Sequence, residues 1–185
     1  MKIKLCLIFC FFCLYSCQQK DSKVVMHMKK MYHKQILLPK CDECIFFGED
    51  ETWKLYPNPQ LRLIIYIDST NCTNCKISEI WNWKKVIEYA KLTDYQFQPL
   101  FIITPVLEKV GEILNALQSN PFEWPIYLDY EGKFLKLNNF LPNSSFYHIF
   151  MLDQDNKIVL IGNPLLNEKL WNLYEGKINL LLNID

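Results

Sequence analysis

The sequence predicts an α/β domain with a central mixed sheet and helices on both faces, preceded by a small N-terminal β element. Aliphatic runs of strand length alternate with amphipathic runs of helix length from residue 61 onward, and this alternation is typical of parallel strands joined by helices. A β-hairpin signal near the end of the chain adds antiparallel strands. The chain has 185 residues, 50% of them hydrophobic and 22% charged, which fits one globular domain.

The expected elements of this domain follow one another in a regular order. In sequence they are a strand over 61–67, a helix over 72–91, a strand over 100–104, a helix over 106–119, a strand over 124–128, a short helix over 134–140, hairpin strands over 146–152 and 157–161, and a helix over 167–182. The second helix has an apolar stripe formed by Leu107, Val110, Leu114 and Leu117, which we expect to face the core.

The N-terminal part divides into three further segments. Residues 1–16 read as a signal peptide, 17–35 as a lipid-anchored tether with a short helix, and 36–60 as the small β element, which leaves 61–185 for the main domain. The short helix, over 24–34, has Val24, Val25, Met28 and Met31 on one side. Within the β element, short strands are expected over 36–39 and 44–47 around a turn.

The first seventeen residues carry an export signal. Lys2 and Lys4 precede an apolar run of about 11 residues, shorter than the roughly 20 that a helix needs to span a bilayer. The run ends at Leu14-Tyr15-Ser16-Cys17, which resembles the lipobox of bacterial lipoproteins and implies acylation of Cys17. We therefore expect a lipid-anchored protein of the cell envelope that faces the periplasm or the cell exterior, where disulfides persist. A cleaved soluble form and an uncleaved anchor are the alternatives.

Charge and glycine content disfavour several classes of function. Twenty basic and twenty acidic residues give a net charge of zero, so the chain has no overall basic field for nucleic acid. There are five glycines and no glycine-rich phosphate loop, which argues against nucleotide binding.

Eight cysteines all lie in the first 75 residues, and one pair has a structural context that explains its spacing. Cys72-Thr73-Asn74-Cys75 follows the first strand of the main domain and opens a helix. Unpaired N–H groups at a helix start lower the pKa of a thiol there, so Cys72 is the expected nucleophile and Cys75 can resolve the mixed disulfide. The intervening Thr73 and Asn74 are neutral, so we expect a modest lowering of the pKa, which favours reduction or isomerisation over strong oxidation.

The chain resembles the thioredoxin-like superfamily, especially the membrane-tethered TlpA/ResA-type thiol–disulfide oxidoreductases and the thioredoxin-like lipoproteins of Bacteroidetes. The resemblance covers about residues 61–182 and is carried by the strand-Cys-x-x-Cys-helix unit, by residues 127–134 and by residues 150–159. It implies a thioredoxin-like fold, attack by Cys72 and resolution by Cys75. It also implies extracytoplasmic protein thiols or disulfides as partners, a thiol-donating redox protein as electron source, and no organic cofactor.

Two positions differ from the family pattern. Asn71 stands where the family usually has tryptophan, and Tyr147 stands at about the place of the cis-proline that precedes the hairpin strand. A cis bond before a residue other than proline costs about 2.5 to 4 kcal/mol, so we expect a trans bond here. Asn71, Tyr147 and His148 are the candidate residues of a substrate groove.

Several alternatives stay open at this point. Cys41 and Cys44 form a second Cys-x-x-Cys pair, which could be structural, an accessory redox pair, or part of a metal site with Cys72 and Cys75, although 27 residues separate Cys44 from Cys72. The whole protein could also be a binding module without turnover. A peroxidase is disfavoured because the one arginine of the chain, Arg62, lies in an apolar strand.

The remaining polar candidates have simpler interpretations. His27 and His33 are expected to be solvated, and His148 to be a hydrogen-bonded core histidine in the hairpin strand. Asp68 ends the first strand near Cys72, where it could cap a turn or accept a proton from Cys75. The tryptophans are expected to be core or groove aromatics; those considered are Trp81, Trp83, Trp124 and Trp171.

Overall fold

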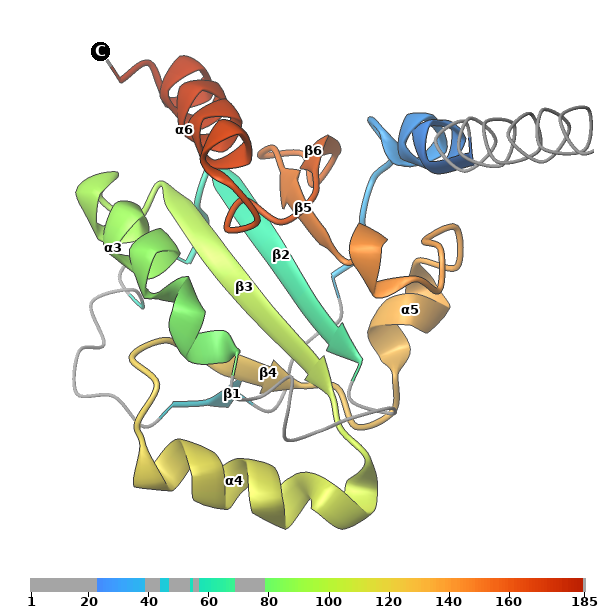
Figure 1. The fold of residues 1–185 in the computed structure, drawn as a ribbon, viewed down its shortest axis with the longest axis vertical. Helices are drawn as coiled ribbons and strands as arrows, with labels where there is room; N and C mark the ends of the chain where they lie inside the picture. The colour runs from blue at the N-terminus through green and yellow to red at the C-terminus, as the bar shows by residue number, and fades with distance from the viewer. Residues whose placement is uncertain (1–22, 39–43, 47–53, 55–56, 69–78, 185) are drawn as a thin grey trace, which may run out of the picture.

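The computed structural model describes residues 23–38, 44–46, 54, 57–68 and 79–184. In these residues a mixed sheet has the strand order β1-β4-β3-β2-β5-β6 (Figure 1). The strands are β1 Cys44–Ile45, β2 Leu61–Asp68, β3 Phe97–Thr104, β4 Ile126–Leu128, β5 Ile149–Leu152 and β6 Ile158–Ile161. The helices are η2 Ile80–Trp83, α3 Lys84–Leu92, η3 Leu107–Lys109, α4 Val110–Ser119, α5 Lys133–Leu137, η4 Ser145–Tyr147 and α6 Glu168–Leu182, besides helical residues 23–31.

Parallel and antiparallel pairs meet at β2. Strands β2, β3 and β4 run parallel, with Asp68 opposite Thr104 at the carboxyl end of the first pair. Strand β5 runs antiparallel to β2, so the residues that precede β5 lie beside the end of β2. The chain therefore brings the carboxyl end of β2 and the segment before Ile149 to the same end of the sheet.

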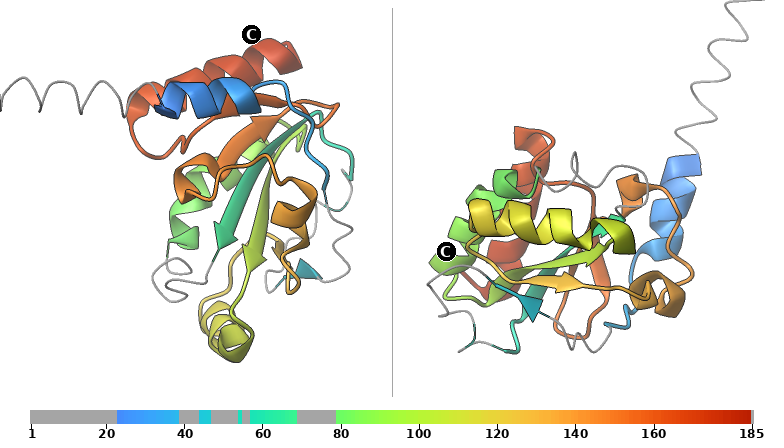
Figure 2. Two further views of the ribbon diagram at one scale, coloured as in Figure 1. Left: turned by 90° about the vertical axis from the view of Figure 1, so that its right-hand side faces the viewer. Right: turned by 90° about the horizontal axis from the view of Figure 1, so that it is seen from below.

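Both faces of the sheet are covered, which explains why β2 is an unbroken aliphatic run. Leu63 and Ile65 point into one core cluster with side chains of α3, α4 and α6. Ile64 and Tyr66 point into a second cluster with side chains of α5 and of the helix over residues 23–31. Figure 2 (right) shows α3 and α6 on one side, and α5 and the N-terminal helix on the other.

The expected β-α-β order from residue 61 is confirmed, with shifted boundaries. The helix expected over 72–91 is described only from Ile80, where it begins as a 3-10 turn before α3; its first part, through residue 78, lies outside the described residues. Strand β4 starts only at Ile126, because Pro125 has no N–H to donate to a neighbouring strand. Helix α5 ends at Leu137, and the next side chain, Asn138, donates to the carbonyl of Phe134 at 2.8 Å.

The stripe expected on the second helix is confirmed in part, because Leu117 is buried and Val110 and Leu114 are half-buried. Leu107 is 64% exposed, whereas Ile113 and Leu117 are buried. The helix starts with a 3-10 turn at Leu107–Lys109, which changes the angular spacing of the residues that follow. The core-facing side of α4 is therefore set by Ile113 and Leu117.

The strand expected over 146–152 begins later than predicted. Ser145–Tyr147 is a 3-10 turn closed by hydrogen bonds from the amides of Tyr147 and His148 to the carbonyls of Ser144 and Ser145, at 3.0 and 3.1 Å. The strand starts at Ile149, so Tyr147 and His148 lie in the turn that leads into it.

The two short strands expected before residue 60 do not pair with each other. Gln35 forms an isolated bridge with Lys157 beside β6, and residues 36–38 continue without strand structure. Cys44–Ile45 pairs with β4 at the opposite edge of the sheet. The strand expected over 36–39 is therefore wrong for the described residues 36–38, whereas the strand expected over 44–47 is confirmed at Cys44–Ile45. The two segments find hydrogen-bond partners at opposite edges of the sheet.

Residues 23–31 are helical, close to the range expected for the short helix. Met31 is buried, and Val24 and Met28 pack against the second core cluster, whereas Val25 is exposed. Among the described residues, no helix combines the length and the apolarity that crossing a bilayer requires.

Candidate functional site

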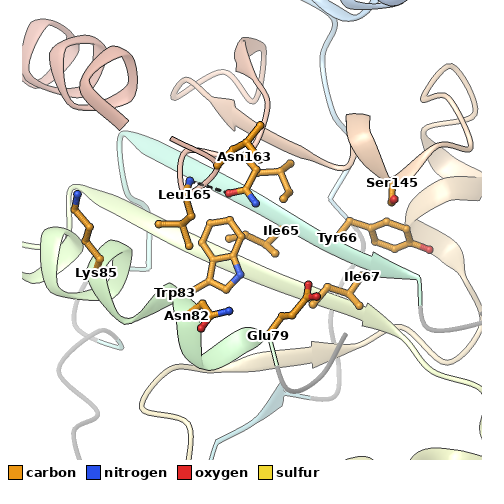
Figure 3. Close-up of a pocket in the computed structure, with 12 residues that line it drawn as sticks. Ile65, Tyr66, Ile67, Glu79, Asn82, Trp83, Lys85, Ser145, Asn163 and Leu165 are labelled. Carbon is orange, nitrogen blue, oxygen red and sulfur yellow. Dashed lines mark hydrogen bonds between the residues drawn. The ribbon is translucent and has the colours of Figure 1, made fainter. Parts of the chain in front are cut away.

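A cavity of about 640 Å³ lies at the carboxyl end of β2 (Figure 3). Four segments far apart in the sequence form its walls: the end of β2, the η2–α3 helix, the turn before β5 and the loop after β6. The lining residues are Ile65, Tyr66, Ile67, Glu79, Asn82, Trp83, Lys85, Ser145, Ile149, Asn163, Leu165 and Leu166. The interior is largely apolar, and the exposed side chains Glu79, Asn82, Lys85 and Ser145 form a polar rim.

The predicted dithiol belongs to the chain segment that joins two of these walls. Strand β2 ends at Asp68, and η2 begins immediately after Glu79. Cys72 and Cys75 fall between them in sequence and lie outside the described residues, as does Asn71. The cavity therefore borders both ends of the segment that contains the two thiols.

Tyr147 and His148, predicted to line a groove, are placed in the core beside the cavity. Tyr147 is 5% exposed and His148 is 2% exposed, and the Tyr147 side chain packs into the second cluster. Their sequence neighbours Ser145 and Ile149 line the cavity instead. None of the described peptide bonds is cis, which confirms the trans bond expected at Tyr147.

His148 is a hydrogen-bonded core histidine, as predicted. Its Nε2 lies 3.0 Å from the carbonyl oxygen of Pro142, and its ring meets the ring of Tyr66 edge-on with centroids 5.0 Å apart. These contacts fix the turn before β5 against the end of β2.

His27 is not solvated as expected. Its ring is half-buried and meets Tyr147 edge-on at 5.4 Å, with Nδ1 3.3 Å from the Tyr147 hydroxyl. The expectation failed because the N-terminal helix packs on the domain through Met28 and Met31 and carries His27 with it. His33 is exposed, as predicted.

A polar chain crosses the sheet near its carboxyl edge. The hydroxyls of Tyr66 and Thr104 are 2.9 Å apart, and Thr104 donates to Asp129 at 3.5 Å. The buried Asp129 carboxylate accepts the amides of Lys133 and Phe134, both at 2.8 Å, and so caps α5. Burial raises the pKa of Tyr66, the charges of Asp68 and Asp129 raise it further, and the hydrogen bond to Thr104 opposes them.

The loop after β6 forms a wall that sequence reasoning missed. Gly162 has φ +124°, in the region that favours glycine, and its amide donates to Ile149 at 2.8 Å. Asn163 accepts the amide of Leu165 at 2.8 Å, and Tyr174 donates to the carbonyl of Gly162 at 2.7 Å. The available signal was Gly162-Asn163-Pro164, a cluster of turn formers just after a strand.

Two charged rim residues were also missed. Glu79 and Lys85 lie on the segment that follows the dithiol, and both side chains are exposed at the cavity. Glu79 and Asn82 follow Cys75 at intervals of four and three residues, a helical spacing that could have pointed to a shared face.

The other cysteines and the arginine are placed as follows. Cys17 and Cys41 lie outside the described residues, and Cys44 is opposite Tyr127 in the β1–β4 pair. Within the described part of the chain, no three histidine, cysteine or acidic residues gather in a metal-binding group. Arg62, near the start of β2, donates to Asn156 at 3.3 Å, and burial lowers its pKa.

The order of elements around β2 decides the fold class. A parallel β2-α3-β3 unit is followed by an antiparallel β5-β6 hairpin and by α6, whose buried side chains join the same core cluster as those of α3. The fold is thioredoxin-like.

Comparisons with known proteins find similar solved structures only at low sequence identity. No protein-family model matches the chain, and no curated protein sequence is significantly similar to it. The thioredoxin domain of a thiol-disulfide oxidoreductase from Bacteroides vulgatus is 19% identical over 77% of this chain and 100% of that one, with a TM-score of 0.46. StoA from Bacillus subtilis is 19% identical over 74% and 98%, with a TM-score of 0.45. A thioredoxin-like protein from Porphyromonas gingivalis is 20% identical over 67% and 76%, with a TM-score of 0.44.

Proposed function

We propose that the protein performs thiol–disulfide exchange on extracytoplasmic protein partners through Cys72 and Cys75. The observation that carries the proposal is the place of the Cys-x-x-Cys segment. It runs from the carboxyl end of β2 to the start of the η2–α3 helix and is flanked at both ends by residues that line a cavity. Ligands of open α/β sheets bind at the carboxyl ends of the strands, where this segment begins.

The exchange needs no group beyond the two thiols. The Cys72 thiolate attacks one sulfur of a client disulfide and forms a mixed disulfide, and the departing client thiolate takes up a proton. The Cys75 thiolate then attacks the Cys72 sulfur and releases the second client thiol, which also takes up a proton. The client gains two electrons and two protons, and the protein holds a Cys72–Cys75 disulfide. A thiol-donating redox protein restores the dithiol by the reverse sequence.

We expect the cavity to offer the client a surface between the two ends of the Cys-x-x-Cys segment, because Ile67 and Glu79 both line it. The partly exposed lining residues Ile67, Ile149 and Leu165 supply apolar area for side chains that flank the client cysteine. Glu79 places a negative charge at the rim, so client segments with a complementary positive charge are favoured. The ammonium of Lys85 lies over the ring of Trp171, 3.9 Å from its centroid.

Reduction or isomerisation is the proposed direction. The residues between the cysteines are neutral, so the helix start is the main influence that lowers the pKa of Cys72. Equilibration with glutathione buffers measures the reduction potential of the pair. We expect a value well below about −120 mV, and a value as oxidising as that contradicts the proposed direction.

The proposed location is the cell envelope, with the chain anchored through acylated Cys17. Growth of the producing bacterium with labelled palmitate tests this anchor. Label should appear in the wild-type protein and be absent from the Cys17→Ala variant, and equal labelling of the two contradicts acylation at Cys17.

The proposed exchange is tested by trapping its intermediate in cells. The Cys75→Ser variant cannot release a client from Cys72, so it should accumulate mixed disulfides that separate from the protein on reduction. The matched control is Cys72→Ser with Cys75→Ser, which should hold no client. Equal capture by both variants contradicts attack by Cys72.

A binding module without turnover is the second candidate. The trans backbone at Tyr147, at about the place where the family has a cis-proline, favours it. Insulin reduction separates the two functions, because a binding module shows no turnover that depends on Cys72.

A further inference from the structure

The outward face of the N-terminal helix combines lysines with exposed apolar side chains. Residues 23–31 are helical, and Val24, His27, Met28 and Met31 form the side that is buried or half-buried against the domain. The opposite side carries Lys23, Val25, Met26, Lys29 and Lys30, all exposed. We refer to this side, with the exposed Tyr32 and Lys34 that follow it, as the basic face.

Charge on the basic face is of one sign. Four lysines occur between residues 23 and 34, and that stretch contains no aspartate or glutamate. The whole chain has no net charge, so the lysines of the basic face are balanced by acidic residues elsewhere in the sequence. A polybasic segment of this kind is attracted to a membrane surface that carries anionic lipids.

Apolar side chains lie among these lysines. Val25 is 48% exposed, Met26 is 45% exposed and Tyr32 is 46% exposed. On a helical projection Lys29 falls between Val25 and Met26, so charged and apolar groups alternate across the face. Lysine side chains extend their ammonium groups to lipid headgroups while neighbouring apolar groups enter the interface.

We propose that the basic face binds the surface of an anionic lipid bilayer. Charge complementarity selects the anionic headgroup, and exposed Val25, Met26 and Tyr32 favour a bilayer over a purely hydrophilic polyanion. The position of the face agrees with the proposed acyl anchor. Only five residues separate Cys17 from Lys23, and such a segment reaches at most about 20 Å.

This inference uses the proposed anchor as support but is tested without it. The probe is the chain produced without residues 1–16 and with Cys17→Ser, which carries no acyl group and retains every described element, since these all lie after residue 22. Sedimentation with phosphatidylcholine vesicles containing about one third phosphatidylglycerol measures the partition coefficient, and pure phosphatidylcholine vesicles are the reference. Failure of vesicle binding would leave acylation at Cys17 and thiol exchange untouched.

We expect binding to the anionic vesicles that weakens as salt is raised. Each lysine near the surface contributes about fivefold, so Lys29→Gln with Lys30→Gln should lower the partition coefficient about 25-fold. The matched control, Lys109→Gln with Lys169→Gln, removes two exposed lysines outside the basic face. It should change the partition coefficient by less than about twofold. Met26→Ser should lower it at least about threefold.

Three results would overturn the proposal. One is equal binding to neutral and anionic vesicles. Another is an equal fall in the partition coefficient of the two double variants. This result would show that binding depends on the total charge of the protein and not on the basic face. The third is unchanged binding of Met26→Ser, which would show that this apolar side chain does not enter the lipid interface. Thermal unfolding of each variant shows whether the fold is retained.

Discussion

The backbone amide of Tyr66 donates to the carbonyl of His148 at 3.0 Å, and the two rings meet edge-on with centroids 5.0 Å apart. This pair joins the end of β2 to the turn before β5. The pair holds Ser145 and Ile149 beside the end of β2, where both residues line one wall of the cavity.

The contact of His148 with Pro142 predicts a loss of stability. His148→Asn removes the buried ring whose Nε2 lies 3.0 Å from the Pro142 carbonyl and leaves that part-buried oxygen without this partner. We expect the free energy of unfolding in urea to fall by about 1 to 3 kcal/mol. His33→Asn is the matched control, since His33 is exposed at a positive φ that asparagine tolerates. A similar change in both variants would contradict the structural role of His148.

The cap on α5 predicts a graded effect at Asp129. Asp129→Ala removes both acceptors from the amides of Lys133 and Phe134, and we expect a cost of about 2 kcal/mol. Asp129→Asn keeps one carbonyl oxygen and should cost about half as much. Glu131→Ala, which breaks an exposed ion pair with Lys133, should cost less than about 0.5 kcal/mol in the same urea titration. If Glu131→Ala costs as much as Asp129→Ala, the cap is not what stabilises α5.

Buried tyrosines predict a loss of stability at high pH. Burial raises the pKa of Tyr174 far above its ordinary value of about 10. The phenol ionises in the unfolded chain first, so its contribution is fully present below pH 10 and is lost as the pH rises further. Stability measured by urea unfolding should therefore fall between about pH 10 and 11.

Tyr174→Phe checks the origin of this pH dependence. It removes the hydrogen bond to the Gly162 carbonyl, which should cost about 1 kcal/mol at neutral pH. The decline of stability above pH 10 should then be shallower than in the wild type. The exposed variant Tyr32→Phe should keep the wild-type slope, and an unchanged slope in Tyr174→Phe would assign the effect to other groups.

The rim of the cavity predicts a change in client selection. Ser145→Trp adds a large side chain at an exposed lining position. It should raise the KM for a protein disulfide several-fold and leave the rate with a small aromatic disulfide unchanged, because only the larger client needs the cavity. Ser119→Trp, exposed at the end of α4, is the matched control and should change neither. If the two substrates are slowed equally by Ser145→Trp, the cavity does not select clients.

The sheet and its helices were predictable because local sequence carries their signals. The aliphatic run of β2 reflects burial on both faces, and the hairpin of β5 and β6 follows from the turn residues Asp153 to Asn156. The N-terminal segment was not predictable in the same way. Gln35 and Cys44 are nine residues apart in sequence yet reach opposite edges of the sheet, and such non-local pairing leaves no periodic signal.

The candidate site was predictable only in part. The Cys-x-x-Cys pair has a local motif, so its place after a strand could be read from the sequence. The cavity walls could not be read from the sequence. Ser145 and Asn163 line the cavity together with Ile65 of β2, although they follow Ile65 by about 80 and 100 residues in the chain. Tyr147 and His148 were assigned to a groove by counting along a strand, and the 3-10 turn at Ser145–Tyr147 turned their side chains into the core.

Reduction of insulin disulfides by the purified protein, with a thiol donor in excess, tests the central claim most directly. The wild type and the Cys41→Ser, Cys44→Ser double variant should both turn over, because the exchange is assigned to the other pair. Cys72→Ser should abolish turnover above the rate of the donor alone. Turnover that persists in Cys72→Ser, or no turnover by the wild type, would contradict the account.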